Sequence, residues 1–148
     1  MRTATPPIDM PADELVLLDS SAAVPLVLRE HPAHDGVMEA VRGRRLGLAG
    51  HAWFETYSAL TRLPPPQRQA SAAVVAALAR NFPDTRFLGE GGAAALAIEL
   101  SSLGIAGGAV YDALVAAAAR QHQATLVTRD ARARRVYEAL GVTVELIA

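Results

Sequence analysis

Four of the fifteen acidic residues stand where a carboxylate is unusual. Asp112 interrupts an apolar stretch, and Glu55 lies among aromatic residues. Asp19 and Asp130 each end a short apolar run. Carboxylates that share one site raise each other's pKa and therefore need a countercharge. Mg²⁺ or Mn²⁺, hard cations that prefer oxygen ligands, would supply that charge and activate water against phosphoryl groups, so the pattern favours phosphodiester hydrolysis.

Each acid has a simpler interpretation when it is taken alone. Asp19 and Asp130 precede expected helices, where an Asp side chain caps free backbone amides. Glu55 and Asp112 could lie in first helical turns, where the helix dipole favours a negative charge. We favour a shared site, because four unrelated caps would not predict acids in apolar stretches on the same side of a parallel sheet.

The elements that must position these acids alternate between strands and helices. Short apolar runs predict strands at residues 14–18, 46–49, 85–88, 124–127 and 142–147. Helices are expected at residues 22–30, 36–42, 52–63, 67–80, 91–103, 110–119 and 131–140, with Pro25 in or beside a first turn. The alternation predicts an α/β fold of three layers, α/β/α, with a mostly parallel central sheet. Asp19 and Asp130 then fall at the carboxyl ends of strands, where such sheets bind ligands.

Length and composition predict one domain with its own core. We expect residues 14–148 to form this domain and the proline-rich residues 1–13 to be a disordered tail, with Met10 as an alternative start. Hydrophobic residues make up 51% of the chain and its mean hydropathy is +0.21. This balance is typical of a globular protein that associates with a partner or with itself.

Two residue types, cysteine and lysine, are missing, and each absence excludes a class of chemistry. The chain has no cysteine, so disulfides, thiolate nucleophiles and zinc-finger spacings are excluded. All fourteen basic residues are arginine, which excludes a Schiff-base lysine and a P-loop lysine. No signal peptide pattern or membrane span is found in the sequence, so we expect a cytoplasmic protein.

The segments around the four acids resemble a known family. LLDSSA, WFETYSAL, GGAVYDALVAAAAR and ATLVTRDARA look like the four acidic motifs of PIN-domain proteins, in particular the VapC-type ribonuclease toxins of type II toxin–antitoxin systems. The resemblance extends over nearly everything from Glu14 to the C-terminus. It implies a PIN-like domain and a metal-dependent endoribonuclease in which Mg²⁺ or Mn²⁺ is held by Asp19, Glu55, Asp112 and Asp130.

The resemblance also implies supporting residues and partners. Ser20 or Ser21 and Thr128 occupy hydroxyl positions that hold carboxylates or a water in place. Some family members carry a further acid two places after the fourth, whereas this chain has Arg132, so a second ion would be weakly held or would need an RNA phosphate as a ligand. The implied partners are an RNA substrate, a small antitoxin protein and a second copy of the chain.

Two rival functions remain open at this point. A phosphatase of the haloacid-dehalogenase type would use Asp19 as nucleophile, but it needs a second acid where Ser21 stands and a lysine that the chain lacks. A degenerate PIN-like module would bind RNA or a protein without cutting.

Trp53 and Phe54 lie beside Glu55 in the sequence. Such aromatic residues are more often part of a core than base-stacking platforms. Two arginine clusters could contact RNA backbone, although solvated helix faces are equally compatible: Arg42, Arg44 and Arg45, and Arg129, Arg132, Arg134 and Arg135.

Overall fold

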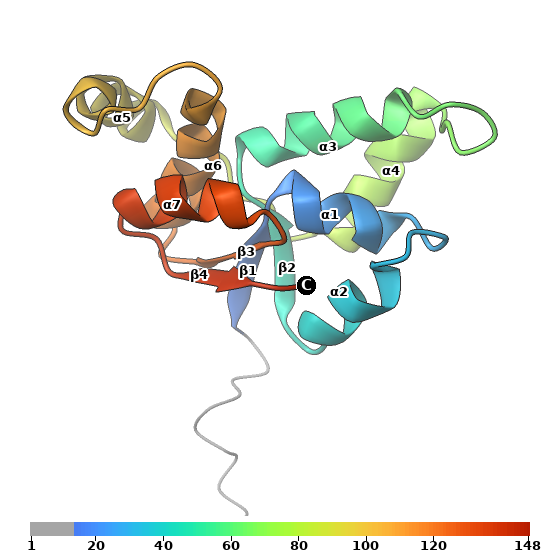
Figure 1. Cartoon of the computed structure of the whole chain (residues 1–148). Helices are drawn as coiled ribbons and strands as arrows, with labels where there is room; N and C mark the ends of the chain where they lie inside the picture. Colours follow the sequence, from blue (N-terminus) through green and yellow to red (C-terminus); the bar gives the residue numbers. More distant parts are fainter. Residues whose placement is uncertain (1–13) are drawn as a thin grey trace, which may run out of the picture.

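A computed structural model describes residues 14–148 (Figure 1). The expected tail, residues 1–13, and the alternative start at Met10 lie outside the described residues. Within residues 14–148 the strands are β1 (Leu15–Leu18), β2 (Arg45–Leu48), β3 (Thr125–Thr128) and β4 (Val144–Leu146). The helices of the same part are α1 (Ser20–Val27), α2 (His34–Ala40), α3 (His51–Thr61), α4 (Ser71–Asn81), α5 (Glu90–Ser102), α6 (Ala109–Gln121) and α7 (Ala131–Ala139).

The four strands form one sheet in the order β2-β1-β3-β4, and every pairing is parallel. This confirms the expected parallel sheet. Val16 in β1 is in register with Leu46 in β2 and with Thr125 in β3, while Leu126 in β3 faces Val144 in β4. All strands therefore present their carboxyl ends at one edge, from which α1, α3 and α7 begin (Figure 1).

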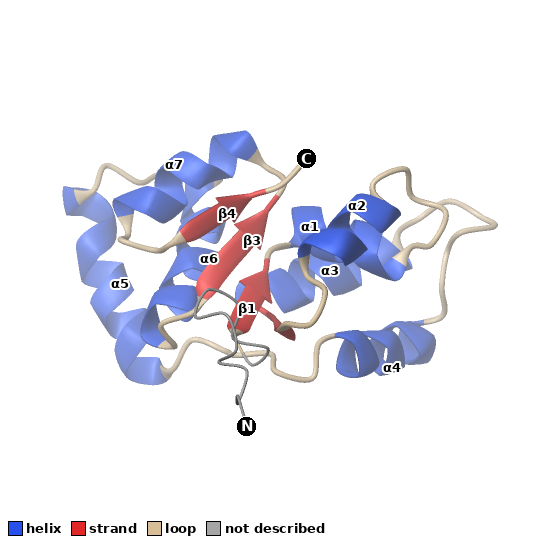
Figure 2. Cartoon of the chain, turned by 90° about the horizontal axis from the view of Figure 1, so that it is seen from below, coloured by secondary structure: helices blue, strands red, loops and turns tan. Residues whose placement is uncertain are grey.

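The sheet separates two hydrophobic cores. Leu17 of β1 packs into a core shared with α5, α6 and α7, whereas its neighbours Val16 and Leu18 pack into a core shared with α1, α2 and α4. Figure 2 shows these two helical layers on opposite sides of the strands. Because successive strand side chains point to opposite faces, a strand buried on both faces must be apolar throughout. The three-layer α/β/α arrangement expected from the sequence is confirmed.

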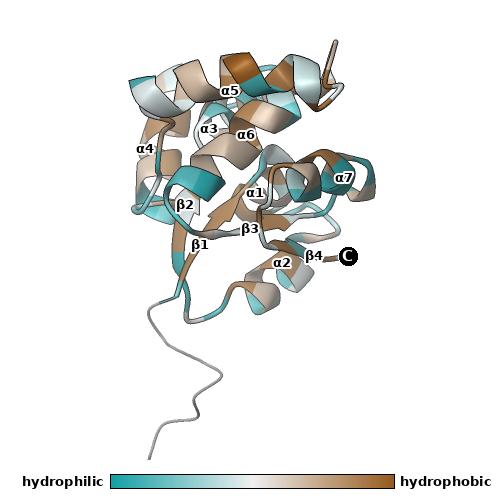
Figure 3. Ribbon diagram, turned by 90° about the vertical axis from the view of Figure 1, so that its left-hand side faces the viewer, coloured by the Kyte–Doolittle hydropathy of each residue, from teal (hydrophilic) through white to brown (hydrophobic). Residues whose placement is uncertain are grey.

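Hydropathy follows this layering. In Figure 3 the strands β1 and β3 are coloured as hydrophobic, whereas hydrophilic residues appear on the helices outside them. Among the helices of residues 14–148, none combines the length and the apolar character that crossing a membrane would require.

The segment 85–88, expected to be a strand, is not one. It makes only an isolated parallel bridge between Ala49 and Arg86. The Thr85 side chain explains the interruption, because its Oγ1 accepts the Leu48 amide at 3.0 Å and takes the place of a backbone carbonyl in the ladder.

Three helices begin two or more residues away from their predicted starts. One of them is α2, which was expected from residue 36 and begins at His34. The helix predicted from residue 67 begins at Ser71, because the Gln67 amide donates to the Pro64 carbonyl at 3.1 Å and closes a turn first. Helix α1 begins at Ser20, so Pro25 lies inside the helix and not in its first turn.

A side chain from another element compensates for Pro25. Proline lacks the N–H that would donate to the carbonyl four residues earlier, that of Ser21. The Arg129 guanidinium donates to this carbonyl at 3.3 Å and also, through Nε, to the Ala148 carbonyl at 3.1 Å. Arg129 thereby ties α1 and the end of the chain to the edge where β3 ends.

Candidate active site

The four acids predicted from the sequence all come to the carboxyl edge of the sheet. Asp19 and Asp130 directly follow β1 and β3, which are neighbours in the sheet. Asp112 lies in the first turn of α6, as the sequence indicated. Glu55 is the fifth residue of α3, so the alternative that it is a first-turn acid is wrong.

Burial and acidic neighbours raise the pKa values of two of the four carboxylates, Glu55 and Asp112. Burial raises the pKa of Glu55, and the negative charges of Asp112 and Asp19 raise it further. Burial likewise raises the pKa of Asp112, with further contributions from Asp130 and Asp19, against a lowering effect of Arg132. Like charges near one another disfavour ionisation in this way. The surroundings of Glu55 and Asp112 therefore disfavour their ionised forms.

Asp19 is the most firmly held of the four. It is only 4% exposed, and four donors converge on its two oxygens. The Ser21 hydroxyl donates to Oδ1 at 2.6 Å, and the Ala22 amide donates to the same oxygen at 3.3 Å as the cap of α1. The Tyr137 hydroxyl donates to Oδ2 at 2.8 Å, and the Thr128 hydroxyl donates to that oxygen too. An ionised carboxylate accepts four bonds of this kind and donates none.

Backbone amides fix the direction of the two small hydroxyls. Ser21 Oγ accepts the Arg129 amide at 2.8 Å, and Thr128 Oγ1 accepts the Asp130 amide at 3.0 Å. Since each hydroxyl carries one hydrogen and already accepts from an amide, its own hydrogen is directed to Asp19. The start of α7 and the carboxylate after β1 are thus joined through side chains.

Of the hydroxyl positions implied by the family resemblance, the structure brings two to Asp19. Ser21 and Thr128 bond it directly. Ser20 makes no side-chain hydrogen bond within residues 14–148 and instead lines a hollow beside Glu55. Its supporting role stays a prediction.

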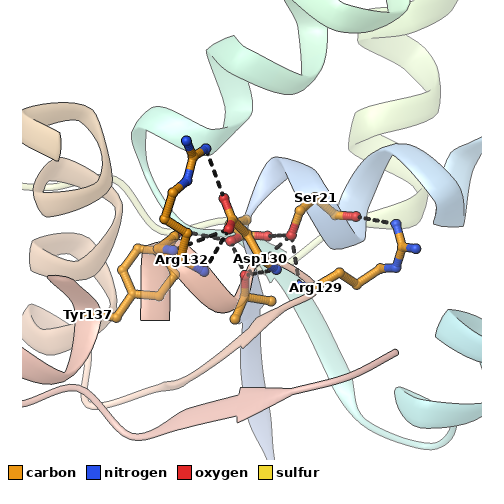
Figure 4. Close-up of polar contacts among 8 residues, drawn as sticks. Ser21, Arg129, Asp130, Arg132 and Tyr137 are labelled. Atoms are coloured by element: carbon orange, nitrogen blue, oxygen red, sulfur yellow. Dashed lines mark hydrogen bonds and ion pairs between the residues drawn. The ribbon is translucent and has the colours of Figure 1, made fainter. Parts of the chain in front are cut away.

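Asp130 caps α7 and remains partly open. Its Oδ1 accepts the amides of Arg132 at 2.9 Å and Ala133 at 3.2 Å, so the capping interpretation is correct for this residue as it is for Asp19. Its Oδ2 lies 3.8 Å from the Arg132 guanidinium, a side chain that is 93% exposed (Figure 4). At Asp130 the capping and the shared site are therefore compatible, because the cap uses only one of the two carboxylate oxygens.

Tyr137 is a site residue that the sequence did not reveal. It is 2% exposed and belongs to the buried face of α7 together with Ala133, four residues earlier. Burial, and then the charge and hydrogen bond of Asp19, raise the pKa of its phenol, so the hydroxyl keeps its proton and donates it. A buried tyrosine needs a partner for its hydroxyl. This rule indicates from the sequence that a buried Tyr137 needs a hydrogen-bond partner, but it does not identify Asp19 as that partner.

We predict that Tyr137→Phe destabilises the protein. The change removes one donor from the buried Asp19 carboxylate, and a hydrogen bond to a charged group contributes about 2 kcal/mol. Urea denaturation should show this loss in the free energy of unfolding. Tyr57→Phe is the matched control, since the Tyr57 hydroxyl has no hydrogen-bond partner within residues 14–148 and should lose little. Equal losses in both variants would contradict the assigned role of the Tyr137 hydroxyl.

Glu55 and Asp112 differ from the two caps in having no protein partner. Within residues 14–148 neither carboxylate accepts a hydrogen bond or forms an ion pair. Both line a cleft of about 800 Å³. Its other walls come from α3, α6 and α7: His51, Ser58, Arg62, Gly108, Ala109, Tyr111, Arg132 and Val136.

The donor set suits a hard cation by its chemistry, although the carboxylates are not gathered around one point. All four candidate ligands are carboxylates, the type that Mg²⁺ and Mn²⁺ prefer. Two of them are partly buried, unpaired and have raised pKa values, so a cation between them would relieve their repulsion. Within residues 14–148, however, no three His, Asp or Glu side chains are already placed to hold one ion.

Comparison with known families decides what this fold is. Residues 16–139 match the family described as PIN domain. The chain belongs to the PIN-domain family. The sequence prediction of a PIN-like α/β/α domain is thereby confirmed, and the match includes β2 and β3 completely and β1 from its second residue.

Relatives of this PIN domain are named ribonucleases. The chain is 45% identical over 131 residues to ribonuclease VapC27 of Mycobacterium tuberculosis strain H37Rv, covering 88% of this chain and 96% of the relative. It is 40% identical over 135 residues to ribonuclease VapC40 of M. tuberculosis strain CDC 1551, covering 90% and 99%. The resemblance to VapC-type proteins is confirmed at the level of sequence.

Two solved structures share the fold at low identity. VapBC2 from Rickettsia felis, solved with a DNA fragment from its promoter, matches with a TM-score of 0.64 at 14% identity and covers 89% of this chain and 98% of that one. FitAcB from Neisseria gonorrhoeae matches with a TM-score of 0.63 at 18% identity, covering 87% and 95%. These likenesses support the PIN fold.

Proposed function

We propose that this PIN domain is a metal-dependent endoribonuclease and the toxin of a toxin–antitoxin pair. The observation that carries the proposal is that Glu55 and Asp112, which have no hydrogen-bond or ion-pair partner within residues 14–148, line one cleft, while Asp19 and Asp130 lie close enough for their negative charges to raise the pKa of Asp112. The relatives named ribonucleases, at 45% and 40% identity, support RNA as the substrate.

In this proposal the four carboxylates hold Mg²⁺ or Mn²⁺. Such a cation, when bound, supplies Lewis acidity for the attack of water on a phosphodiester. Glu55 and Asp112 would contribute the carboxylates that have no other partner, and Asp19 and Asp130 would contribute oxygens oriented by capping. Ser21 and Thr128 would keep Asp19 in one orientation through the bonds that they donate.

Two arginines are placed to bind the substrate's phosphates. Arg62 and Arg132 line the cleft with the acids, and the Arg62 side chain has no partner within residues 14–148. The cluster at residues 42–45 is less suitable, because its arginines pair with acids: Arg42 with Glu39, Arg44 with Glu14 and Glu145, and Arg45 with Asp84. We therefore assign phosphate contacts to the cleft pair.

A small antitoxin and a second copy of the chain are the proposed protein partners. Large apolar side chains stay exposed on the helical layers, among them Met38, Val75 and Ile98. Exposed apolar surface of this kind is typical of proteins that associate. The fold shared with a VapBC assembly supports an antitoxin as one partner. We place the protein in the cytoplasm, where its RNA substrate would be found.

The test is cleavage of total cellular RNA by the purified protein. With Mg²⁺ or Mn²⁺ we expect discrete fragments, and with EDTA we expect intact RNA. Calorimetric titration with Mn²⁺ in parallel should detect binding. If the protein yields no fragments and binds no metal, the endoribonuclease proposal fails and the alternative of a degenerate module that binds RNA or a protein takes its place.

A further inference from the structure

Arg129 holds both the side chain and the backbone of Ser21. Its backbone amide donates to Ser21 Oγ at 2.8 Å, and its guanidinium donates from Nη1 to the Ser21 carbonyl at 3.3 Å (Figure 4). The Nε of the same guanidinium donates to the Ala148 carbonyl at 3.1 Å. In the sequence Arg129 belonged to a cluster that could contact RNA backbone, but its guanidinium bonds two carbonyls of the chain itself. Ser21 is therefore fixed at two points by a residue 108 positions away.

The contact with the Ser21 carbonyl is possible because α1 contains a proline. In a regular helix this carbonyl would accept the amide of the residue four positions later, but that residue is Pro25, which has no N–H. A backbone carbonyl without its helical donor needs a partner from elsewhere. Pro25 thus leaves an acceptor open, and Arg129 supplies the donor.

Ser21 transmits this anchoring to the first carboxylate of the site. Its hydroxyl donates to Asp19 Oδ1 at 2.6 Å and lies 3.3 Å from Thr128 Oγ1, the hydroxyl that bonds the other oxygen of Asp19. Because Ser21 Oγ also accepts the Arg129 amide, its hydrogen points to Asp19 only while the first turn of α1 stays in place. A displacement of that turn would move the donor away from the carboxylate.

The fold can position a cation only through the carboxylates that it holds. Glu55 and Asp112 have no hydrogen-bond or ion-pair partner within residues 14–148, whereas Asp19 and Asp130 accept hydrogen bonds from the protein. Groups that hydrogen-bond a metal ligand keep it in its binding orientation, and their replacement typically weakens metal binding about tenfold to a hundredfold. The anchoring of Ser21 therefore bears on how well Asp19 binds a cation.

We propose that Arg129 is a positioning residue that holds Ser21 at the carbonyl left open by Pro25 and thereby keeps Asp19 in the orientation that binds Mg²⁺ or Mn²⁺. This inference rests on the proposed metal site and adds to it a residue whose side chain acts on the cation only through Ser21 and Asp19. Because Arg129 acts one step further away than Ser21, its loss should weaken metal binding less than the loss of the Ser21 hydroxyl.

Calorimetric titration of the purified protein with Mn²⁺, in the absence of RNA, tests the proposal. Arg129→Met keeps a long unbranched side chain and removes its donors. We expect this variant to bind Mn²⁺ about fivefold more weakly than wild type, and Ser21→Ala to bind it about tenfold to a hundredfold more weakly. Circular dichroism at the temperature of the titration checks the fold. Should Arg129→Met not fold, Arg129→Gln, whose shorter side chain keeps an N–H donor, takes its place.

Pro25→Ala gives the sharpest comparison. Alanine restores an N–H that can donate to the Ser21 carbonyl within α1, so the helix no longer needs Arg129 there. Pro25→Ala alone should bind Mn²⁺ within about twofold of wild type, and the double variant Pro25→Ala/Arg129→Met should regain that affinity. A general loss of stability at Arg129 would not be rescued by a change at this one carbonyl.

Arg120→Met is the matched control. The Arg120 guanidinium also joins separate elements, because it donates to Glu99 at 3.0 and 2.8 Å and to the Leu140 carbonyl at 3.4 Å. Within residues 14–148 it has no bond to Ser21 or Asp19, and it does not line the cleft. Its replacement should lower the melting temperature but leave Mn²⁺ affinity within about twofold of wild type.

The outcomes separate this inference from the broader function. Absence of Mn²⁺ binding by wild type would remove the proposed metal site and the role of Arg129 with it. If wild type binds Mn²⁺ and Arg129→Met binds it equally well, the metal site stands and the positioning role is wrong. Equal weakening in Arg120→Met, or no rescue by Pro25→Ala, would overturn the positioning role as well.

Discussion

Replacing Asp112 with Asn is expected to lower RNA cleavage about a hundredfold or more while it raises the melting temperature of the metal-free protein. The loss of activity follows because a ligand charge disappears from the proposed metal site, and the metal contributes several kcal/mol of charge stabilisation to the reaction. The gain in stability follows because Asp112 is partly buried, has no hydrogen-bond or ion-pair partner within residues 14–148 and lies beside other acids. Asparagine keeps the shape and removes the repulsion.

The same repulsion between acids makes the folded state less stable as the pH rises. Burial and the charges of Asp130 and Asp19 raise the pKa of Asp112, and burial with the charges of Asp112 and Asp19 raises the pKa of Glu55. The folded protein therefore binds these protons more tightly than the unfolded chain, which has ordinary values near 4. Their contribution to stability is complete below that pH and is lost as the pH rises through the raised values. In Asp112→Asn this loss should be smaller.

Metal removal should affect wild type and Asp112→Asn differently. A ligand at a hundred times its dissociation constant stabilises the folded state by about 2.7 kcal/mol. In wild type, Mn²⁺ at that concentration should raise the melting temperature by roughly 5 to 10 °C, and EDTA should reverse the rise. The same addition should have little effect on Asp112→Asn, because one carboxylate of the proposed site is missing.

Asp35→Asn is the matched control for this variant. Asp35 is an exposed acid of α2 that does not line the cleft, so its replacement should leave cleavage and the response to Mn²⁺ unchanged. If Asp112→Asn cleaves RNA like wild type, or if Mn²⁺ stabilises both proteins equally, Asp112 is not a ligand and the proposed metal site is wrong.

The sequence predicted the parts of the site that follow from the order of strands and helices. Asp19 and Asp130 each end a buried strand, and parallel strands bring such residues to one edge whatever the details of packing. Asp112 could be predicted for a different reason, because a carboxylate is unusual in an otherwise apolar helix. For these residues local sequence and topology are sufficient.

Other residues of the site depend on contacts between distant segments. Tyr137 reaches Asp19 across 118 positions, and the angle at which α7 packs determines that contact. The stacking of His51 on Tyr111 likewise requires α3 and α6 to meet. The segment at 85–88 has strand composition, but the Thr85 side chain replaces a backbone acceptor there. Residue types and spacing do not encode such contacts.

Asp19→Ala is expected to be much more destabilising than Asp130→Ala, although both residues follow parallel strands and cap helices. Alanine at Asp130 removes the cap of α7 at a partly exposed position and should cost about 1 kcal/mol. Alanine at Asp19 removes a cap too, but it also leaves the hydroxyls of Ser21, Thr128 and Tyr137 without their acceptor.

The difference between the two losses in unfolding free energy measures what the buried hydrogen bonds to Asp19 contribute. A buried donor that loses its partner costs about 1 to 3 kcal/mol, so Asp19→Ala should lose about 4 kcal/mol in total even after the donors partly rearrange. Urea denaturation of both variants gives the comparison, with the slopes used to check that the unfolded states are alike. Equal losses would mean that the hydroxyls find other acceptors and that Asp19 is only a cap. A loss that is several times larger at Asp19 means that the fold itself holds this carboxylate in place, whereas Glu55 and Asp112 have no hydrogen-bond or ion-pair partner within residues 14–148.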